Sequence, residues 1–256
     1  MTPARFGRTA AFSESAEAYR ATMAPALEPV AAEVVRRARL GPGERVLDVG
    51  TGTGTAVRLA LGDGRRVIGL DAAAGMLEIA RHEVSGAEWL EADFTRIPLD
   101  DRAFDVVIGV HALLFASDRV EALAEWRRVT TPGGRLSISV PGPDYAVPSA
   151  IFGDVYERYG VDWNVRDYPD LDLLASWARD AGWDDIVTEA DPTSGIPLRD
   201  EAAFLTWLRV GRTLTDWEPE RLEALAQDLM AVSPKAADGG WRLPFGSQYL
   251  TARRGA

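Results

Sequence analysis

The chain of 256 residues contains no cysteine, and this absence excludes disulfide bonds, thiolate nucleophiles and thiolate metal sites. Imidazole is also scarce, because His82 and His111 are the two histidines and fall on separate predicted elements. We therefore expect no structural metal. A magnesium ion held by carboxylates stays open as an alternative, although no acidic cluster indicates one.

The sequence also lacks a long apolar run. No stretch approaches the roughly 20 apolar residues of a membrane span. The first six residues do not form the apolar core of a signal peptide. We expect a soluble, cytoplasmic protein with no membrane partner.

Clustered positive charge is a third absence. The formal net charge is −11, and the arginines are scattered in short pairs such as Arg127-Arg128. Because binding to nucleic-acid phosphates needs clustered Lys and Arg, we expect no nucleic-acid partner. A chain of this length can bury a substantial core as one unit, so a single domain is predicted over residues 1–256.

A glycine-rich turn organises the rest of the sequence. The apolar run Val46–Val49 breaks into Gly50, Gly52 and Gly54, and helix-forming residues follow. This order predicts a strand, a sharp turn and a helix. Glycines let a ligand lie against the main chain, and a helix N-terminus favours negative charge. A nucleotide-binding turn is indicated; an ordinary strand-to-helix connection is the alternative.

A second predicted strand ends at Asp71, about 20 residues after Gly50, where nucleotide-binding sheets place the carboxylate that holds the ribose hydroxyls. The spacing of the glycines discriminates between cofactors. The dinucleotide fingerprint G-x-G-x-x-G would need a glycine where Thr55 stands. NAD or FAD is therefore the lesser interpretation.

Apolar strands alternate with helical segments through the first 140 residues. The predicted strands are Arg45–Val49, Val67–Leu70, Glu88–Leu90, Phe104–Gly109 and Arg135–Val140, with helices at Thr53–Leu61, Ala74–His82 and Arg119–Val129. Such alternation predicts parallel strands joined by right-handed crossovers.

The two ends of the chain add further helices and strands. One helix is predicted from Ser13 and a second from Pro25, which suits a first turn. The predicted elements after residue 140 are a helix at Leu171–Ala181, a strand at Asp184–Ala190, two helices within Leu198–Val232 and a last strand at Pro244–Arg253.

Five motifs then occur in order with compatible spacing. They are the glycine turn, Asp71 with Ala72 and Met76, Glu91–Phe94, Ala103–His111, and Arg127–Leu136. With these motifs the chain resembles the class I S-adenosylmethionine-dependent methyltransferases, and is most similar to the small-molecule branch called type 11 or ubiquinone/menaquinone-biosynthesis-like. The resemblance covers roughly Phe12 to Val140 well.

The resemblance implies an α/β, Rossmann-like, doubly wound sheet of seven strands. The sheet would be mostly parallel, with the last strand inserted antiparallel between the fifth and sixth. Residues 1–40 would form N-terminal helices, 41–140 the cofactor-binding core, and 141–182 and 198–240 substrate-side helical segments. The late helices would cover the active site or support a dimer contact, or only pack on the sheet, so the protein is expected to be a monomer or homodimer.

The resemblance also implies a cofactor site for S-adenosyl-L-methionine, with S-adenosyl-L-homocysteine as product. The implied cofactor-binding residues are Tyr19, Asp48, Gly50, Thr51, Gly52, Gly54, Asp71, Ala72, Met76, Ala92, Asp93, Phe94 and Val110. The turn would lie against the methionine part, with Asp48 near its amino end, and Asp71 would hold both ribose hydroxyls.

The remaining residues of this set would surround the adenine and the methyl group. Ala72 and Met76 would lie beside the adenine, and Asp93 would accept a hydrogen bond from its amino group while Ala92 and Phe94 flank it. Val110 would line the path to the sulfonium. Tyr19 would lie on the helix that folds over the cofactor; simple packing between helices is the equal alternative.

His111 is the candidate catalytic residue. The resemblance puts it near the methyl group, and its ordinary pKa suits a general base at neutral pH. Relatives commonly hold Gln, Asn or Ser at this position, so a hydrogen-bonding or packing role and catalysis by proximity alone stay open. Tyr145 or Tyr156 could instead orient an acceptor hydroxyl.

Aromatic residues are dense after residue 140, at Phe152, Tyr156, Tyr159, Trp163, Tyr168, Trp177, Phe204, Trp207 and Trp217. Most are expected to be core. Since ligands of open α/β sheets bind beyond the carboxyl ends of the strands, we expect some of these rings to wall an apolar substrate pocket together with Tyr19 and Leu113–Phe115.

The leading hypothesis is methyl transfer from S-adenosylmethionine to a small, largely apolar or aromatic acceptor, at oxygen, nitrogen or carbon. Quinone-ring C-methylation is the nearest alternative. A protein that binds the cofactor without transferring its methyl group, and a nicotinamide reductase, are the alternatives from other classes.

Overall fold

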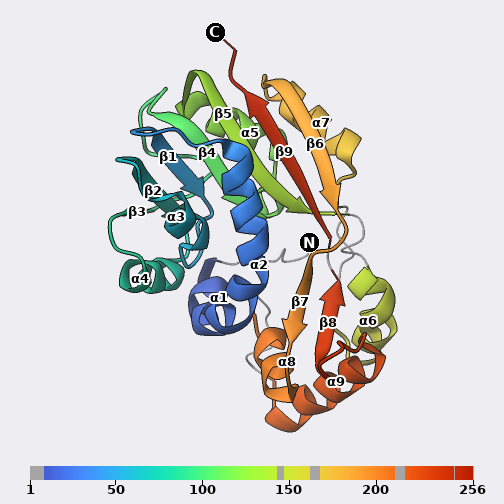
Figure 1. The fold of residues 1–256 in the computed structure, drawn as a ribbon. Helices are drawn as coiled ribbons and strands as arrows, with labels where there is room; N and C mark the ends of the chain where they lie inside the picture. Colours follow the sequence, from blue (N-terminus) through green and yellow to red (C-terminus); the bar gives the residue numbers. More distant parts are fainter. Residues whose placement is uncertain (1–8, 143–146, 162–167, 211–216, 245, 256) are drawn as a thin grey trace.

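The central element of the computed structural model is a twisted sheet of seven strands (Figure 1). The structure describes residues 9–142, 147–161, 168–210, 217–244 and 246–255. The strands of this sheet are β1 (Arg45–Val49), β2 (Arg66–Asp71), β3 (Glu88–Glu91), β4 (Phe104–Val110), β5 (Thr130–Pro141), β6 (Asp184–Asp191) and β9 (Ser247–Arg253).

The strand order is β3-β2-β1-β4-β5-β9-β6. The neighbours from β3 to β5 pair in parallel, whereas β9 runs antiparallel to both β5 and β6. This topology confirms the predicted Rossmann-like sheet, including the insertion of the last strand between the fifth and sixth. The carboxyl ends of β1, β2 and β4 therefore meet at one edge, where the chain reverses its winding direction.

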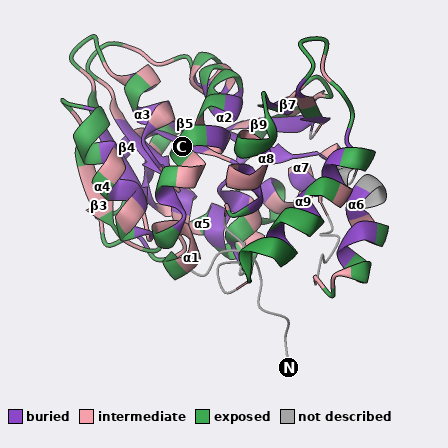
Figure 2. Cartoon of the chain, turned by 90° about the horizontal axis from the view of Figure 1, so that it is seen from below, coloured by how far each residue is buried: buried purple, intermediate pink, exposed green. Residues whose placement is uncertain are grey.

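Helices cover both faces of the sheet because buried strands are apolar on both sides. On β1, Val46 belongs to one buried cluster with residues of α2 (Ala16–Ala38) and α3 (Thr55–Ala60), whereas Leu47 belongs to another with residues of α5 (Arg119–Val129) and α7 (Leu171–Asp180). Figure 2 shows the resulting pattern, with buried residues between the layers and exposed residues on the outer helix surfaces. The helix α4 (Ala74–Glu83) lies beside β2 and β3.

The N-terminal helices differ from the prediction in two respects, because the first helix starts at Thr9 and not at Ser13, and no new helix starts at Pro25. A short α1 (Thr9–Glu14) precedes α2, and α2 continues through Pro25 and Pro29 instead of restarting at Pro25. A proline inside a helix costs about 3 kcal/mol through the lost hydrogen bond and the steric clash. Each fully buried apolar side chain on the same helix recovers about 1.5–3 kcal/mol. The buried face of α2, which includes Val30 and Val34, therefore keeps the helix continuous.

A small lobe lies beyond the carboxyl ends of the parallel strands (Figure 1). It contains the antiparallel pair β7 (Gly195–Leu198) and β8 (Trp241–Pro244) with helices α6 (Val147–Arg158), α8 (Glu201–Leu208) and α9 (Pro219–Val232). The two predicted late helices are confirmed as α8 and α9. The strand predicted from Pro244 is wrong at its start, because Pro244 ends β8 and the long strand begins at Ser247.

The helix α2 connects the two parts of the molecule, since it contacts β4 and β5 in the sheet and β7 and α8 in the lobe. Across residues 9–255, apart from the gaps given above, no helix combines the length and apolarity that crossing a membrane requires.

Candidate functional site

The glycine turn follows β1 in a conformation that only glycine adopts easily. Gly50, Gly52 and Gly54 all have positive φ, at 65°, 55° and 86°. A methyl carbon on Gly50 would lie 2.7 Å from the Cβ of Ala112, and one on Gly54 would lie 2.8 Å from the Trp89 ring. Ala112 and Trp89 therefore pack closely against the turn. The main chain of Gly50 and Gly52 borders a cavity.

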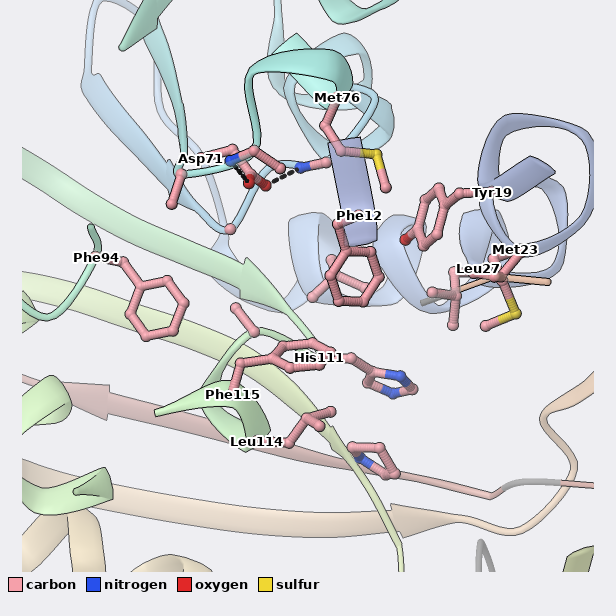
Figure 3. A pocket seen from close by; sticks show the side chains of 18 of the residues that line it. Phe12, Tyr19, Met23, Leu27, Asp71, Met76, Phe94, His111, Leu114 and Phe115 are labelled. Carbon is pink, nitrogen blue, oxygen red and sulfur yellow. Dashed lines mark hydrogen bonds between the residues drawn. The ribbon is translucent and has the colours of Figure 1, made fainter. Parts of the chain in front are cut away.

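Asp71, at the end of β2, fixes this turn from the neighbouring strand. Its Oδ2 accepts a hydrogen bond from the Gly52 amide at 2.8 Å, and its Oδ1 accepts one from the Ala73 amide at 2.9 Å (Figure 3). Burial raises the pKa of Asp71, while these amide bonds oppose the rise. Each carboxylate oxygen has a second lone pair, so Asp71 can still accept from a ligand in the cavity.

Asp48 lies behind the turn and is fully buried. Its Oδ2 accepts a hydrogen bond of 2.6 Å from the hydroxyl of Thr51, and its Oδ1 has no hydrogen-bond partner among the described residues. Burial raises the pKa of Asp48 to about 7; the Thr51 bond lowers it, and the charge of Asp71 raises it. The carboxyl groups of Asp48 and Asp71 therefore lie at the same glycine turn. Among the described residues, no Lys or Arg lines the cavity beside this turn.

One cavity of about 370 Å³ extends from the turn to the small lobe. Near the turn it is lined by Gly52, Asp71 and Met76, and Phe94 forms a side wall (Figure 3). The far end is bordered by apolar residues of α2, of the ends of β4 and β5, and of the small lobe. Those far-end residues include Met23, Leu27, Leu114, Pro141, Ile196, Trp207, Val210, Leu243 and Pro244.

The structure brings together ten of the predicted cofactor and catalytic residues in this cavity. They are Tyr19, Gly50, Gly52, Asp71, Ala72, Met76, Asp93, Phe94, Val110 and His111. Asp48, Thr51, Gly54 and Ala92 do not line it. Asp48 and Thr51 lie behind the turn, Gly54 faces Trp89, and the Ala92 amide donates to the carbonyl of Asp71 at 3.0 Å.

His111 follows β4 and is held in an unusual backbone conformation, with φ at 54°. Its amide donates to the carbonyl of Ser139 at 3.0 Å, and its Nε2 lies 3.2 Å from the hydroxyl of Ser247 on β9. Burial lowers the pKa of the imidazole to about 3, so the ring is neutral at physiological pH. A neutral imidazole can donate or accept a hydrogen bond, and it is a much weaker base than an ordinary histidine.

The predicted aromatic wall is confirmed in part. Tyr168 and Trp207 line the cavity together with Leu114 and Phe115. Phe152, Tyr156 and Leu113 are fully buried core residues instead. Tyr145 and Trp163 lie outside the described residues.

Sequence reasoning missed several lining residues. Met23 and Leu27 follow Tyr19 at intervals of four, so helical spacing along α2 was a signal that could have found them. Ile196 and Leu243 come from β7 and β8, which no sequence pattern predicted.

Within the described ranges, no group of three His, Asp or Glu side chains could hold a metal ion.

Comparisons with known proteins agree with this architecture. A family model described as "Methyltransferase domain" matches residues 47–138. A demethylmenaquinone methyltransferase of Renibacterium salmoninarum is 32% identical over 166 residues, which cover 57% of this chain and 68% of that protein. A malonyl-[acyl-carrier protein] O-methyltransferase of Serratia marcescens is 38% identical over 129 residues, which cover 50% of each chain.

Among solved structures, the [4+2]-cyclase SpnF superposes with a TM-score of 0.61 at 22% identity, covering 90% of this chain and 81% of that one. At this level of identity the similarity shows the shared fold.

Proposed function

We propose, since the chain belongs to the S-adenosylmethionine-dependent methyltransferase family, that it transfers the methyl group to a small, uncharged, largely apolar or aromatic acceptor. The observation that carries this proposal is the single cavity that joins the turn at Gly52 and Asp71 to an apolar end in the small lobe. Such a cavity can hold a polar cofactor and an apolar acceptor side by side.

The cofactor half is assigned to residues around the turn. The bare main chain of Gly50 and Gly52 would lie against the methionine part, and the free lone pairs of Asp71 would accept from the ribose hydroxyls. Met76 and Phe94 would enclose the adenine, with the exposed carboxylate of Asp93 as acceptor for its amino group. When bound, S-adenosylmethionine supplies a methyl group on a sulfonium, which is already activated for transfer.

The acceptor half favours a particular chemistry. Met23, Leu27, Ile196 and Leu243 present hydrocarbon to the far end of the cavity, and His111 is neutral there. A carboxylate or ammonium placed among these groups would lose its hydration without gaining a counter-charge from them. An uncharged ring or alkyl chain would instead gain from burial.

The protein's part in the reaction is mainly to orient the acceptor. The nucleophilic atom must lie in line with the sulfur–methyl bond, at a distance where positioning supplies much of the rate. The cofactor would supply the methyl group and leave as S-adenosylhomocysteine, and a proton carried by the accepting atom would be released to water. His111 would orient a hydroxyl or carbonyl of the acceptor through one ring nitrogen.

Methylation of a quinone ring carbon is the specific second candidate. It is supported by the demethylmenaquinone methyltransferase relative and by the apolar acceptor half. The malonyl-[acyl-carrier protein] relative acts on a different kind of acceptor, and the apolar lining gives that alternative less support.

The test measures cofactor binding and methyl transfer on the wild-type protein and the Asp71→Ala variant. Titration calorimetry should give binding of S-adenosylhomocysteine by the wild type and a loss of at least about 100-fold in affinity for the variant. Labelled methyl donor, incubated with uncharged phenols and hydroquinones, should release S-adenosylhomocysteine in equal amount to methylated product. A wild-type protein that binds neither donor nor product would overturn the proposal, and binding without transfer to any acceptor would favour the non-transferring alternative.

A further inference from the structure

Thr51 holds a buried carboxylate and the neighbouring strand at the same time. Its hydroxyl donates to Asp48 at 2.6 Å, and its amide donates to the carbonyl of Leu70 on β2 at 2.9 Å. Both residues are buried. Thr51 therefore fixes the orientation of the Asp48 carboxylate relative to both strands.

The neighbouring strand leaves room for this hydroxyl. At Gly69 on β2, a methyl carbon would lie 2.9 Å from the Thr51 hydroxyl oxygen and 2.6 Å from the ring of Trp89. The register pairs Asp48 with Gly69, so the space opens directly beside the carboxylate. A larger residue at position 69 would displace the hydroxyl or the indole.

The second oxygen of Asp48 lacks a hydrogen-bond donor among the described residues. This Oδ1 is buried without a hydrogen bond from the described residues, and leaving a buried carboxylate oxygen unsatisfied is costly. The charged group that acts on Asp48 from β2 is Asp71, and its negative charge makes ionisation of Asp48 still less favourable. On the β4 side, Asp48 pairs with Ile108, which brings no titratable group.

We infer that Thr51 is a positioning residue for the cofactor: its hydroxyl fixes the Asp48 carboxylate behind the turn as the negative charge that attracts the ammonium group of the cofactor's methionine part. The inference rests on the proposed function, which places that part of the cofactor at the turn. Without the hydroxyl, Asp48 would lose a donor that favours its ionised form.

The test compares ligands with and without the amino-acid part that carries the ammonium group. S-adenosylhomocysteine carries the ammonium group, whereas 5′-methylthioadenosine has the same adenosine and sulfur but no amino-acid part. Affinities of both ligands for the wild-type, Thr51→Val and Thr51→Ser proteins would be measured by titration calorimetry between pH 5.5 and pH 8.5. Val keeps the shape of Thr without its hydroxyl, and Ser keeps the hydroxyl.

For Thr51→Val we expect the affinity for S-adenosylhomocysteine to fall about tenfold at pH 7, with less than about a twofold change for 5′-methylthioadenosine. The rise of S-adenosylhomocysteine affinity with pH should also shift to higher pH, because more alkaline solution is needed to ionise Asp48. Thr51→Ser should restore both the affinity and the pH profile.

Thr130→Val is the matched control, because Thr130 is equally buried and its hydroxyl donates to the Trp126 carbonyl at 2.7 Å, away from the cavity. It should lower stability without changing either affinity or the pH profile. Equal losses for the two ligands, or an unchanged pH profile in Thr51→Val, would overturn the inference and leave Thr51 a structural residue. Failure of the wild type to bind either ligand would instead overturn the proposed function itself.

Discussion

Gly75 and Ser13 bring the first helix into main-chain contact with α4. The Gly75 amide donates to the Ser13 hydroxyl at 3.3 Å, and a methyl carbon on Gly75 would lie 2.5 Å from the Ser13 carbonyl oxygen. This close approach sets Phe12 in the cavity, where its ring forms T-shaped pairs with Phe115 and Tyr19 at centroid distances of 5.3 and 6.5 Å (Figure 3).

The Gly75→Ala variant should push α1 away and remove the Phe12 wall. Because an aromatic pair contributes about 0.5–1.5 kcal/mol, we expect affinity for S-adenosylhomocysteine to fall by up to roughly tenfold. The fold itself should persist, since alanine stabilises a helix by about 1 kcal/mol relative to glycine. The control is Gly153→Ala in α6, where no atom lies within 4 Å of the added methyl. Calorimetry that gives the same affinity for both variants would show that α1 docking does not retain the ligand.

The His111→Asn variant should keep methyl transfer within about tenfold of wild type. The pKa of about 3 makes His111 a weak base, and Asn can replace its hydrogen bond while tolerating the positive φ. A general base would contribute about 10²–10⁴-fold. Single-turnover rates with labelled donor between pH 5.5 and pH 8 decide the question. A loss above 100-fold, or a wild-type inflection near pH 6.5 that the variant lacks, would restore the general-base role.

The Ile196→Ala variant should weaken binding of the acceptor and leave binding of the cofactor unchanged. Ile196 on β7 borders the apolar end of the cavity, so its truncation should raise the KM of the acceptor while the Kd of S-adenosylhomocysteine stays the same. The free energy of unfolding should also fall by about 2–5 kcal/mol. Leu225→Ala in α9 is the control, because Leu225 is buried in the same lobe without lining the cavity. Equal KM changes in the two variants would mean that lobe stability, and not the wall, sets acceptor affinity.

The Asp48→Asn variant should change how stability depends on pH. Burial raises the pKa of Asp48 from 3.8 to about 7, so the ligand-free folded state holds a proton that the unfolded state releases between these values. The free energy of unfolding of the wild type should therefore fall as pH rises from about 4 to about 7, by at most about 1.4 kcal/mol per pH unit from this group. Asn removes this contribution.

Urea denaturation at pH 5 and pH 7, without cofactor, checks that prediction. The stability difference between the variant and the wild type should move in favour of the variant at the higher pH. Asp71 is present in both proteins, so its titration differs between them only through its coupling to the Asp48 charge. Parallel pH dependence of the two proteins would contradict the raised pKa.

The proposed cofactor half of the site could be predicted from the sequence because its signals are local. Gly50, Gly52 and Asp71 mark the ends of adjacent parallel strands, and the fixed handedness of the crossovers places those ends together. The acceptor half was not accessible in the same way. Ile196 and Leu243 meet through an antiparallel pair that joins distant parts of the chain, and the turn signals between them do not specify that partner.

The sequence by itself determined the alternation of strands and helices from β1 to β5, the glycine turn and the carboxylate beside it, because each depends on residues close together in the chain. The tertiary structure decided that α2 passes through two prolines, that His111 is buried and neutral beside Ser247, and that one oxygen of the Asp48 carboxylate finds no partner in the described part of the chain. These features depend on desolvation and packing between distant segments, and such effects arise only when the chain has folded.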